Sequence, residues 1–247
     1  MFQNHYLIIK KEMLTPIMCR LVISCDEVAQ AASAGQFVHI KADGFFLRRP
    51  ISISEIDKTA GTISIVFEQR GEGTKKMLEL QESDLIDMLA PLGNGFNTEG
   101  IKKALIVGGG IGVFPLLQVA KDCENSTVVL GFRNREAVVL EDDFRKYTND
   151  LTICTDDASY GTGGFVTAPF EKAISTGGYD MVCACGPEIM LERVIALAHQ
   201  FGVRCLISKE ERMACGTGAC LVCACKAVKD GEETMARVCK DGPVFEV

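Results

Sequence analysis

The chain has 247 residues, of which 47% are hydrophobic, so it is long enough for two domains with cores and its composition excludes an intrinsically disordered chain. Its formal net charge is -7, from 26 Lys and Arg against 33 Asp and Glu. A nucleic-acid-binding protein usually carries a basic face, so this composition argues against that class and we expect no nucleic-acid partner.

The first 100 residues alternate short β-prone runs with turn signals such as Ala34-Gly35 and Ala60-Gly61. Strands of this length and spacing are typical of a small barrel or sandwich. The runs cover residues 7–9, 18–23, 37–40, 51–53 and 62–67. We therefore predict a β-rich domain over residues 1–100.

Two candidate phosphate sites lie in this region. The first is Leu47-Arg48-Arg49-Pro50-Ile51-Ser52, because arginine can bind a phosphate with two hydrogen bonds and Ser52 can hydrogen-bond the edge of a ring. Taken alone, two arginines beside a strand fit a solvated surface as well. The second is Gly71-Glu72-Gly73-Thr74, where Thr74 can cap a predicted helix over residues 75–80 and free amides would receive a phosphate.

From residue 103 the pattern changes to alternating strands and helices, which predicts a parallel α/β domain over residues 101–209. The predicted strands cover residues 104–107, 127–130, 151–154, 181–184 and 205–207, and the predicted helices cover residues 114–121, 141–147 and 187–201. The first strand is a continuous apolar run, as expected where both faces of a sheet are covered.

A glycine-rich loop follows the first of these strands and contains Gly108, Gly109, Gly110 and Gly112. Such a loop lets backbone amides approach a pyrophosphate at a helix N-terminus, but it serves tight packing equally well. Cys185-Gly186-Pro187 ends another predicted strand, at the edge where parallel sheets bind ligands. By itself Cys185 fits a buried structural thiol, and its interest comes from the nearby loop.

Five of the twelve cysteines lie in the last 38 residues, and four of them have the spacing C-x4-C-x2-C followed after fifteen residues by another Cys. This is the spacing of plant-type [2Fe–2S] proteins, and it assigns the cluster to Cys215, Cys220, Cys223 and Cys239. Gly216 and Gly218 suit a loop that wraps a cluster with positive φ angles. Structural zinc and buried core thiols are the alternatives, and Cys225 is a fifth thiol that could compete as a ligand. We predict a separate cluster-binding segment over residues 210–247.

The start of the chain lacks the basic and apolar regions of a secretory signal, and the apolar run over residues 104–120 contains four Gly and one Pro. We therefore expect a cytoplasmic protein with no membrane-spanning segment.

In this order, the motifs resemble the ferredoxin–NADP reductase superfamily. Its members have a flavin-binding barrel with an R-x-[aromatic]-S motif, a glycine-capped helix at the flavin pyrophosphate, and a nucleotide domain with G-x-G-x-[x]-P and C-G-P motifs. The matching positions here are Arg49 to Ser52, Gly73-Thr74, Gly110 to Pro115 and Cys185 to Pro187. The resemblance implies a β + α/β fold: an N-terminal antiparallel flavin-binding β-barrel, a Rossmann-like parallel α/β nucleotide domain and a small C-terminal [2Fe–2S] segment.

The cysteine segment narrows this resemblance, over essentially the whole chain, to the electron-transfer subunits of NAD-dependent, type B dihydroorotate dehydrogenases. The stretches that carry it are Arg48 to Ser52, Met213 to Gly216, Gly218 to Cys220 and Val238 to Phe245. The resemblance implies FAD, a [2Fe–2S] cluster and NAD as cofactors. It implies as partner an FMN-containing catalytic subunit that forms orotate in pyrimidine biosynthesis, in a heterotetramer of two plus two.

The same resemblance implies roles for individual residues. Those for FAD are Arg49, Pro50, Ile51, Ser52, Val66, Phe67, Glu68, Gly73 and Thr74. Those for NAD are Gly108, Gly109, Gly110, Gly112, Cys185, Gly186 and Pro187. It implies no acid–base residue in this chain; Ser52 and Cys185 would lie near the flavin and the nicotinamide.

Two departures from the superfamily pattern matter. Ile51 stands where many members have the aromatic that stacks on the flavin, so this flavin face is aliphatic. Arg133 and Arg135 could meet a 2′-phosphate of NADP, whereas the family implies NAD.

The alternative functions are the small subunit of another flavin and iron–sulfur NAD(P)H oxidoreductase, of the ferredoxin:NADP or sulfide dehydrogenase type, and a zinc-stabilised binding module. Those small subunits tend to carry an Asp among the cluster ligands, whereas all four positions here are Cys.

Overall fold

A computed structural model describes residues 1–229 and 232–247. Its contacts form two compact units, one of Met1–Gly95 with Glu210–Val244 and one of Phe96–Lys209 with Phe245–Val247. The sequence boundaries after residues 100 and 209 stay a prediction. In the structure the cysteine segment packs with the barrel, because so short a segment has little core of its own.

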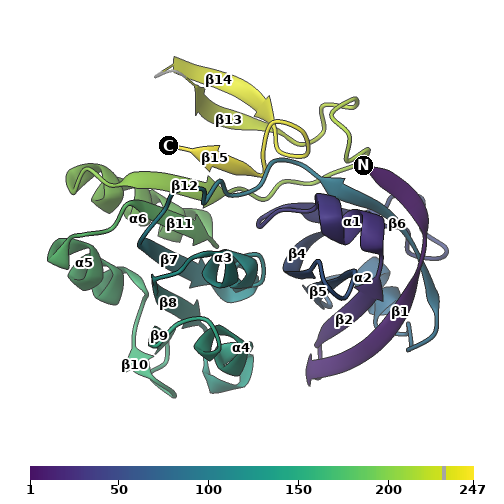
Figure 1. The fold of residues 1–247 in the computed structure, drawn as a ribbon, viewed down its shortest axis with the longest axis horizontal. Helices are drawn as coiled ribbons and strands as arrows, with labels where there is room; N and C mark the ends of the chain where they lie inside the picture. Colours follow the sequence, from purple (N-terminus) through teal and green to yellow (C-terminus); the bar gives the residue numbers. More distant parts are fainter. Residues whose placement is uncertain (230–231) are drawn as a thin grey trace. The chain divides into compact units, whose positions relative to one another are not determined.

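Six antiparallel strands close the barrel of the first unit in the order β1-β2-β5-β4-β3-β6 (Figure 1). The expected antiparallel β-barrel is thereby confirmed. The strands are β1 (Phe2–Thr15), β2 (Met18–Ser24), β3 (Phe37–Ile40), β4 (Arg49–Asp57), β5 (Thr62–Glu68) and β6 (Leu85–Leu92), and the helices are α1 (Asp26–Ala31) and α2 (Glu72–Met77).

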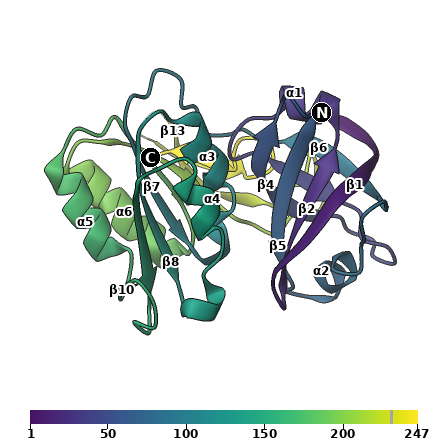
Figure 2. The ribbon, with the colours of Figure 1, turned by 60° about the horizontal axis from the view of Figure 1, so that its bottom comes forward.

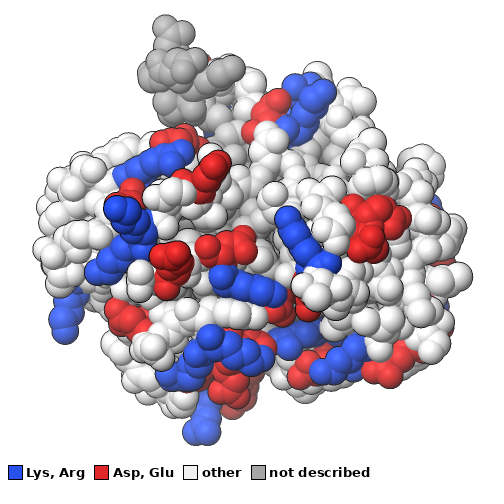
Figure 3. Space-filling view, in the orientation of Figure 1, with Lys and Arg blue, Asp and Glu red and all other residues white. Residues whose placement is uncertain are grey.

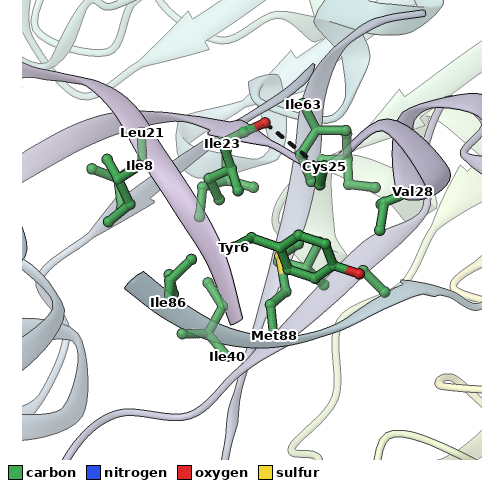
Figure 4. Close-up of a cluster of buried hydrophobic side chains, with 14 of the residues drawn as sticks. Tyr6, Ile8, Leu21, Ile23, Cys25, Val28, Ile40, Ile63, Ile86 and Met88 are labelled. Carbon is green, nitrogen blue, oxygen red and sulfur yellow. Dashed lines mark hydrogen bonds between the residues drawn. The ribbon is translucent and has the colours of Figure 1, made fainter. Parts of the chain in front are cut away.

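Alternate side chains of the barrel strands fill its interior, as period-two patterning requires. Figure 4 shows this core, with isoleucines from several strands meeting Met88 and the ring of Tyr6. The Tyr6 hydroxyl reaches the edge of the core and donates a 2.9 Å hydrogen bond to Glu27 Oε1 of α1. Burial, with a smaller contribution from Glu27, raises the pKa of Tyr6 well above its ordinary value.

The second unit is a seven-stranded sheet in the order β10-β9-β8-β7-β11-β12-β15. Pairs from β10 to β12 are parallel, which confirms the predicted parallel α/β architecture. Its elements are β7 (Ala104–Gly109), η1 (Gly110–Val113), α3 (Leu116–Asp122), β8 (Ser126–Phe132), η2 (Arg135–Ala137), α4 (Glu141–Arg145), β9 (Asp150–Thr155), β10 (Thr162–Gly163), α5 (Thr167–Thr176), β11 (Met181–Cys185), α6 (Glu188–Gln200), β12 (Arg204–Ser208) and β15 (Val244–Glu246).

Helices cover both faces of this sheet (Figure 2). Helices α5 and α6 contact each other and cover one face, while α3 and α4 cover the other. After β7 the chain moves to β8 on one side, and it later returns to β11 on the other side. The ends of β7 and β11 therefore form the switch point where open α/β sheets bind their ligands.

The cysteine segment, residues 210–247, contains a loop followed by the antiparallel hairpin β13 (Ala224–Lys229) and β14 (Glu232–Arg237).

On the face displayed in Figure 3, basic and acidic side chains are interspersed. Within the described residues, no helix has the length and apolar character needed to cross a membrane.

Candidate cofactor and cluster sites

Arg49 and Gly73 meet at one end of the barrel. Arg49 begins β4, which runs antiparallel to β5, and α2 follows directly after β5. This connection brings the helix start to the start of β4. A Cβ built on Gly73 would overlap the guanidinium of Arg49, so a side chain there would displace the arginine from this position. A guanidinium over the first turn of a helix is an arrangement suited to a phosphate.

The helix itself differs from the sequence prediction. It spans Glu72–Met77 with Gly71 as N-cap, so Thr74 lies inside the first turn and is not the cap. The Thr74 hydroxyl accepts hydrogen bonds from the N–H groups of Arg70 (2.8 Å) and Gly71 (3.2 Å). Thr74 therefore holds the loop that leads into the helix, while the Gly73 backbone lies against Arg49.

The other residues assigned to FAD lie on neighbouring parts of β4 and β5. Pro50, Ile51 and Ser52 are half-buried in β4, and Ile51 packs against the barrel core. Val66 and Phe67 are buried near the end of β5, where Glu68 forms a 3.0 Å ion pair with Arg70. Because β4 and β5 are hydrogen-bonded neighbours, these residues gather at the end of the barrel that holds Arg49.

The glycine loop and Cys185-Gly186-Pro187 lie side by side at the switch point of the sheet. Cys185 is paired in register with Gly108. A Cβ on Gly112 would overlap the carbonyl of Cys185, and one on Gly109 would lie 2.9 Å from Pro187 Cδ. These glycines are therefore needed for packing, which is one of the two interpretations that the sequence left open.

Gly110 has different surroundings. It is exposed, its φ is +57°, and a Cβ there would meet no atom within 4 Å. It thus leaves open space at the end of β7, where a ligand of the sheet would approach. Within this one loop, Gly109 and Gly112 allow close packing, whereas Gly110 leaves space for a ligand.

Three cysteines of the spacing motif lie in the loop before the hairpin and the fourth lies in the turn after it, with unequal exposure. Cys220 is exposed, Cys215 is half-buried, and Cys223 and Cys239 are buried. Gly216 and Gly218 have φ values of +70° and +86°, as the sequence predicts for a wrapping loop. Cys225 is half-buried in β13, two residues beyond Cys223.

Backbone N–H groups point at two of the sulfurs. Thr217 N lies 3.4 Å from Cys215 Sγ, and Cys239 N lies 3.4 Å from Cys223 Sγ. Burial raises the pKa of Cys215, but hydrogen bonds from Thr217 and Cys220 outweigh it and lower that pKa to about 5. Burial, and then the neighbouring Cys223 thiol, raise the pKa of Cys239 to about 12. Cys220 therefore lies near the Cys215 thiol, and Cys223 near the Cys239 thiol.

Across residues 1–229 and 232–247, no three His, Cys, Asp or Glu side chains converge on one point as a single metal ion requires. Two pairs of thiols suit a binuclear cluster, in which each iron takes two cysteine ligands. The donor set, all sulfur with amides directed at it, is compatible with such a cluster.

Arg237, at the end of β14, connects the hairpin to the loop that carries Cys215 and Cys220, which we call the cluster loop. Arg237 binds Asp241 through Nε (2.9 Å) and Nη2 (3.0 Å), and its Nη1 donates to the Gly218 carbonyl (3.2 Å). The Arg237 guanidinium lowers the pKa of Asp241 to about 2. Gly218 also packs against Lys240, since a Cβ there would lie 2.6 Å from Lys240 Cδ.

Sequence reasoning missed two features of this site. Leu221, between two cysteines, has a φ of +61° and is 62% exposed, and Val222 beside it is 54% exposed. His39 of β3 is fully buried beside the cluster loop. Burial, and then the charge of Arg48, lower the pKa of His39 to about 4. A lone histidine in an apolar run gives no sequence signal of such a position.

The fold is that of ferredoxin reductases. A solved structure of an NADH-dependent reduced ferredoxin–NADP oxidoreductase superposes with a TM-score of 0.85 at 30% identity, covering 98% of this chain and 88% of that one. The cytochrome b5 reductase domain of Ulva prolifera nitrate reductase has a TM-score of 0.65 at 13% identity, covering 81% of this chain and 93% of that one, and it shows the fold alone.

Sequence comparison specifies the family. The profile of the iron–sulfur cluster binding domain of dihydroorotate dehydrogenase B matches residues 210–247. The dihydroorotate dehydrogenase B (NAD(+)) electron transfer subunit of Geobacillus thermodenitrificans is 41% identical, over 96% of this chain and 94% of its own length. That of Streptococcus mutans is 40% identical, over 97% and 94%. The chain belongs to the family of dihydroorotate dehydrogenase B electron transfer subunits.

Proposed function

We propose that this chain carries electrons between NAD and an FMN-containing catalytic subunit that oxidises dihydroorotate to orotate, by way of FAD and a [2Fe–2S] cluster. The observation that carries the proposal is the set of four cysteines, in two pairs, packed on the barrel that holds the Arg49–Gly73 site. When bound, FAD exchanges a hydride with the nicotinamide and single electrons with the cluster.

The barrel residues have defined tasks in this proposal. Arg49 and the backbone at Gly73 bind the flavin pyrophosphate, because a guanidinium and free helix amides converge there. Ser52 hydrogen-bonds near the flavin ring, and Ile51 offers an aliphatic surface to it. Val66, Phe67 and Glu68 line the flavin through the end of β5. The contact of Arg49 with Gly73 is the observation that supports this assignment.

The switch point of the sheet binds NAD. Gly112 lets the loop pack against Cys185 of β11, Gly109 lets it pack against the start of α6, and Gly108 packs against α3 and β8. Gly110 admits the dinucleotide at the exposed end of β7. Cys185, Gly186 and Pro187 follow at the adjacent strand end and border the nicotinamide. None of these groups transfers a proton, since hydride transfer depends on position.

Cys215, Cys220, Cys223 and Cys239 would hold the cluster, which would supply one-electron transfer. The spacing of the four cysteines and the N–H groups directed at the Cys215 and Cys223 sulfurs support this assignment. The exposed Cys220 marks the side from which electrons leave. Leu221 and Val222 next to it form an exposed apolar pair suited to a partner protein. We propose a heterotetramer of two such chains and two catalytic subunits.

A second candidate is the small subunit of another flavin and iron–sulfur NAD(P)H oxidoreductase. The 30% identity and the TM-score of 0.85 to the ferredoxin–NADP oxidoreductase structure favour it over unrelated functions. The two candidates differ in the partner that accepts or supplies electrons. Coupling of dihydroorotate oxidation to NAD reduction distinguishes them, since only the first requires it.

The test compares Cys220→Ser with Cys225→Ser in the complex reconstituted with the catalytic subunit. Cys220→Ser should leave reduction of the flavin by NADH largely intact and abolish NADH formation from dihydroorotate. Cys225→Ser, a thiol of the same hairpin region, should keep both reactions. If Cys220→Ser still coupled dihydroorotate to NAD at the normal rate, the proposed route through the cluster would be wrong.

A further inference from the structure

His39 is a buried polar side chain in a strand that is otherwise apolar. Its neighbours in β3 are Phe37, Val38 and Ile40, and all four residues are buried. Val38 and Ile40 belong to the barrel core, so His39 and Phe37 point from the opposite face of the strand. That face of a barrel strand would normally meet solvent.

The cysteine segment covers this outer face of β3. A Cβ built on Gly93 would lie 3.0 Å from Phe37 Cε1 and 2.5 Å from Pro243 Cδ, so Phe37 lies under the end of the segment. A Cβ built on Gly216 would lie 2.5 Å from His39 Nδ1. The imidazole therefore lies directly beneath the loop residue that follows Cys215.

Neither ring nitrogen of His39 makes a hydrogen bond of good geometry, and the nearest polar groups to the imidazole are the backbone of Arg48 and of Cys215. A buried polar group without a partner is destabilising, and a leucine would fill the same position without that cost. Orphaned buried nitrogens point to a partner that is bound there when the protein works. The loop beside His39 is the one that we assign to the cluster.

We propose that His39 is a positioning residue for the iron–sulfur cluster: its imidazole, held by barrel strand β3, donates a hydrogen bond to sulfur on the Cys215 side of the bound cluster. The inference rests on the proposed function, because it needs a cluster at these cysteines. The hydrogen bond fixes the cluster loop on the barrel that carries the flavin site. It also favours the reduced cluster, whose sulfurs carry more negative charge.

The direct test is pulsed EPR of the reduced full-length chain, loaded with FAD and cluster and labelled with ¹⁵N-histidine. The chain has three histidines, His5, His39 and His199, and the other two are exposed. We expect a ¹⁵N coupling to the cluster that disappears in His39→Leu and persists in His5→Gln and His199→Gln. A cluster signal without histidine coupling in the wild-type chain would overturn the inference.

The midpoint potential of the cluster provides a second readout. Losing one hydrogen bond to a charged acceptor should change the ratio of reduced to oxidised cluster about tenfold at a fixed potential, which corresponds to about 59 mV for one electron. His39→Leu should lower the potential, and His39→Gln, which keeps an N–H donor, should restore part of it. An unchanged potential in His39→Leu would contradict the inference.

Two further outcomes are distinguishable. If His39→Leu does not retain the cluster, the ¹⁵N coupling in the wild-type chain and the midpoint potential of His39→Gln test the inference instead. If the wild-type chain shows no iron–sulfur signal after reconstitution with iron and sulfide, the proposed function itself fails. A normal cluster signal with no effect of His39 removes only the role of this histidine.

Discussion

The guanidinium of Arg49 lies against the backbone of Gly73, so closely that a Cβ on Gly73 would overlap it. The two residues are 24 positions apart and meet because β4 and β5 are antiparallel neighbours and α2 follows β5 at once. Arg49 also contacts the ring of Phe45, with its Cζ 4.9 Å from the ring centre. The site therefore depends on the absence of one side chain.

Replacing Gly73 with alanine should weaken FAD binding. The new methyl group would displace Arg49, and the loss of a hydrogen bond to a charged group costs about 1.5–3 kcal/mol, a factor of ten to a hundred in affinity. Isothermal titration or flavin retention during gel filtration measures this. Gly71→Ala is the matched control, because a Cβ there would meet nothing within 4 Å. Equal affinities in the two variants would exclude the arginine–glycine site.

Gly112→Ala should disturb the switch point of the sheet. Its Cβ would overlap the carbonyl of Cys185, and overpacking of this kind costs about 1–3 kcal/mol. We expect a lower melting temperature together with a raised KM for NADH. Gly110→Ala has open space but a positive φ, so its cost in stability should be about 1 kcal/mol. If Gly110→Ala left the KM for NADH unchanged, the loop would serve packing alone.

Leu221→Asn tests the apolar pair beside Cys220. Asparagine tolerates the φ of +61° better than leucine does, so the fold should be at least as stable. Loss of the exposed leucine should weaken binding of the catalytic subunit about ten- to a hundredfold, since burying such a side chain contributes about 1.5–3 kcal/mol. Reduction of a soluble dye by NADH should not change. Phe165→Asn, which removes another strongly exposed apolar side chain, is the control.

Tyr6→Phe tests the hydrogen bond from the barrel core to α1. Burial and Glu27 raise the pKa of Tyr6 in the folded state, so its contribution to stability is complete below about pH 10, the ordinary tyrosine value. It is lost as the pH rises above that value, because ionisation then favours the unfolded chain. At neutral pH the free energy of unfolding of the variant should be about 1 kcal/mol lower than that of the wild type, and its melting temperature should fall accordingly. Its stability should fall less steeply than that of the wild type in alkali.

Much of the fold could be predicted from the sequence, because its signals are local. The continuous apolar run of β7 indicates a strand that is buried on both faces, and the alternating runs of β2 and β5 indicate strands that are buried on one face. Strand β6 was not predicted, because Pro91 near its end reads as a turn signal although Ile86, Met88 and Ala90 alternate inward. Helix α5 was not predicted either; Pro169 lies in its first turn, where it is tolerated.

The motif residues of the candidate sites could be named from spacing and resemblance, but their contacts could not. The close approach of the Gly112 backbone to the carbonyl of Cys185 depends on the register of β7 with β11, which is a tertiary property. The same holds for His39, whose burial is caused by a segment more than 170 residues later in the chain. A lone histidine in the short apolar run of β3 indicates nothing about what covers it.

The most direct measurement is an anaerobic NADH titration of the purified chain, followed by visible absorption and EPR. The proposed relay predicts that flavin bands bleach and that the signal of a reduced [2Fe–2S] cluster grows with them. Flavin bleaching with no iron–sulfur absorption after reconstitution would contradict the assignment of Cys215, Cys220, Cys223 and Cys239 to a cluster. A colourless chain that binds neither group would contradict the electron-transfer function altogether.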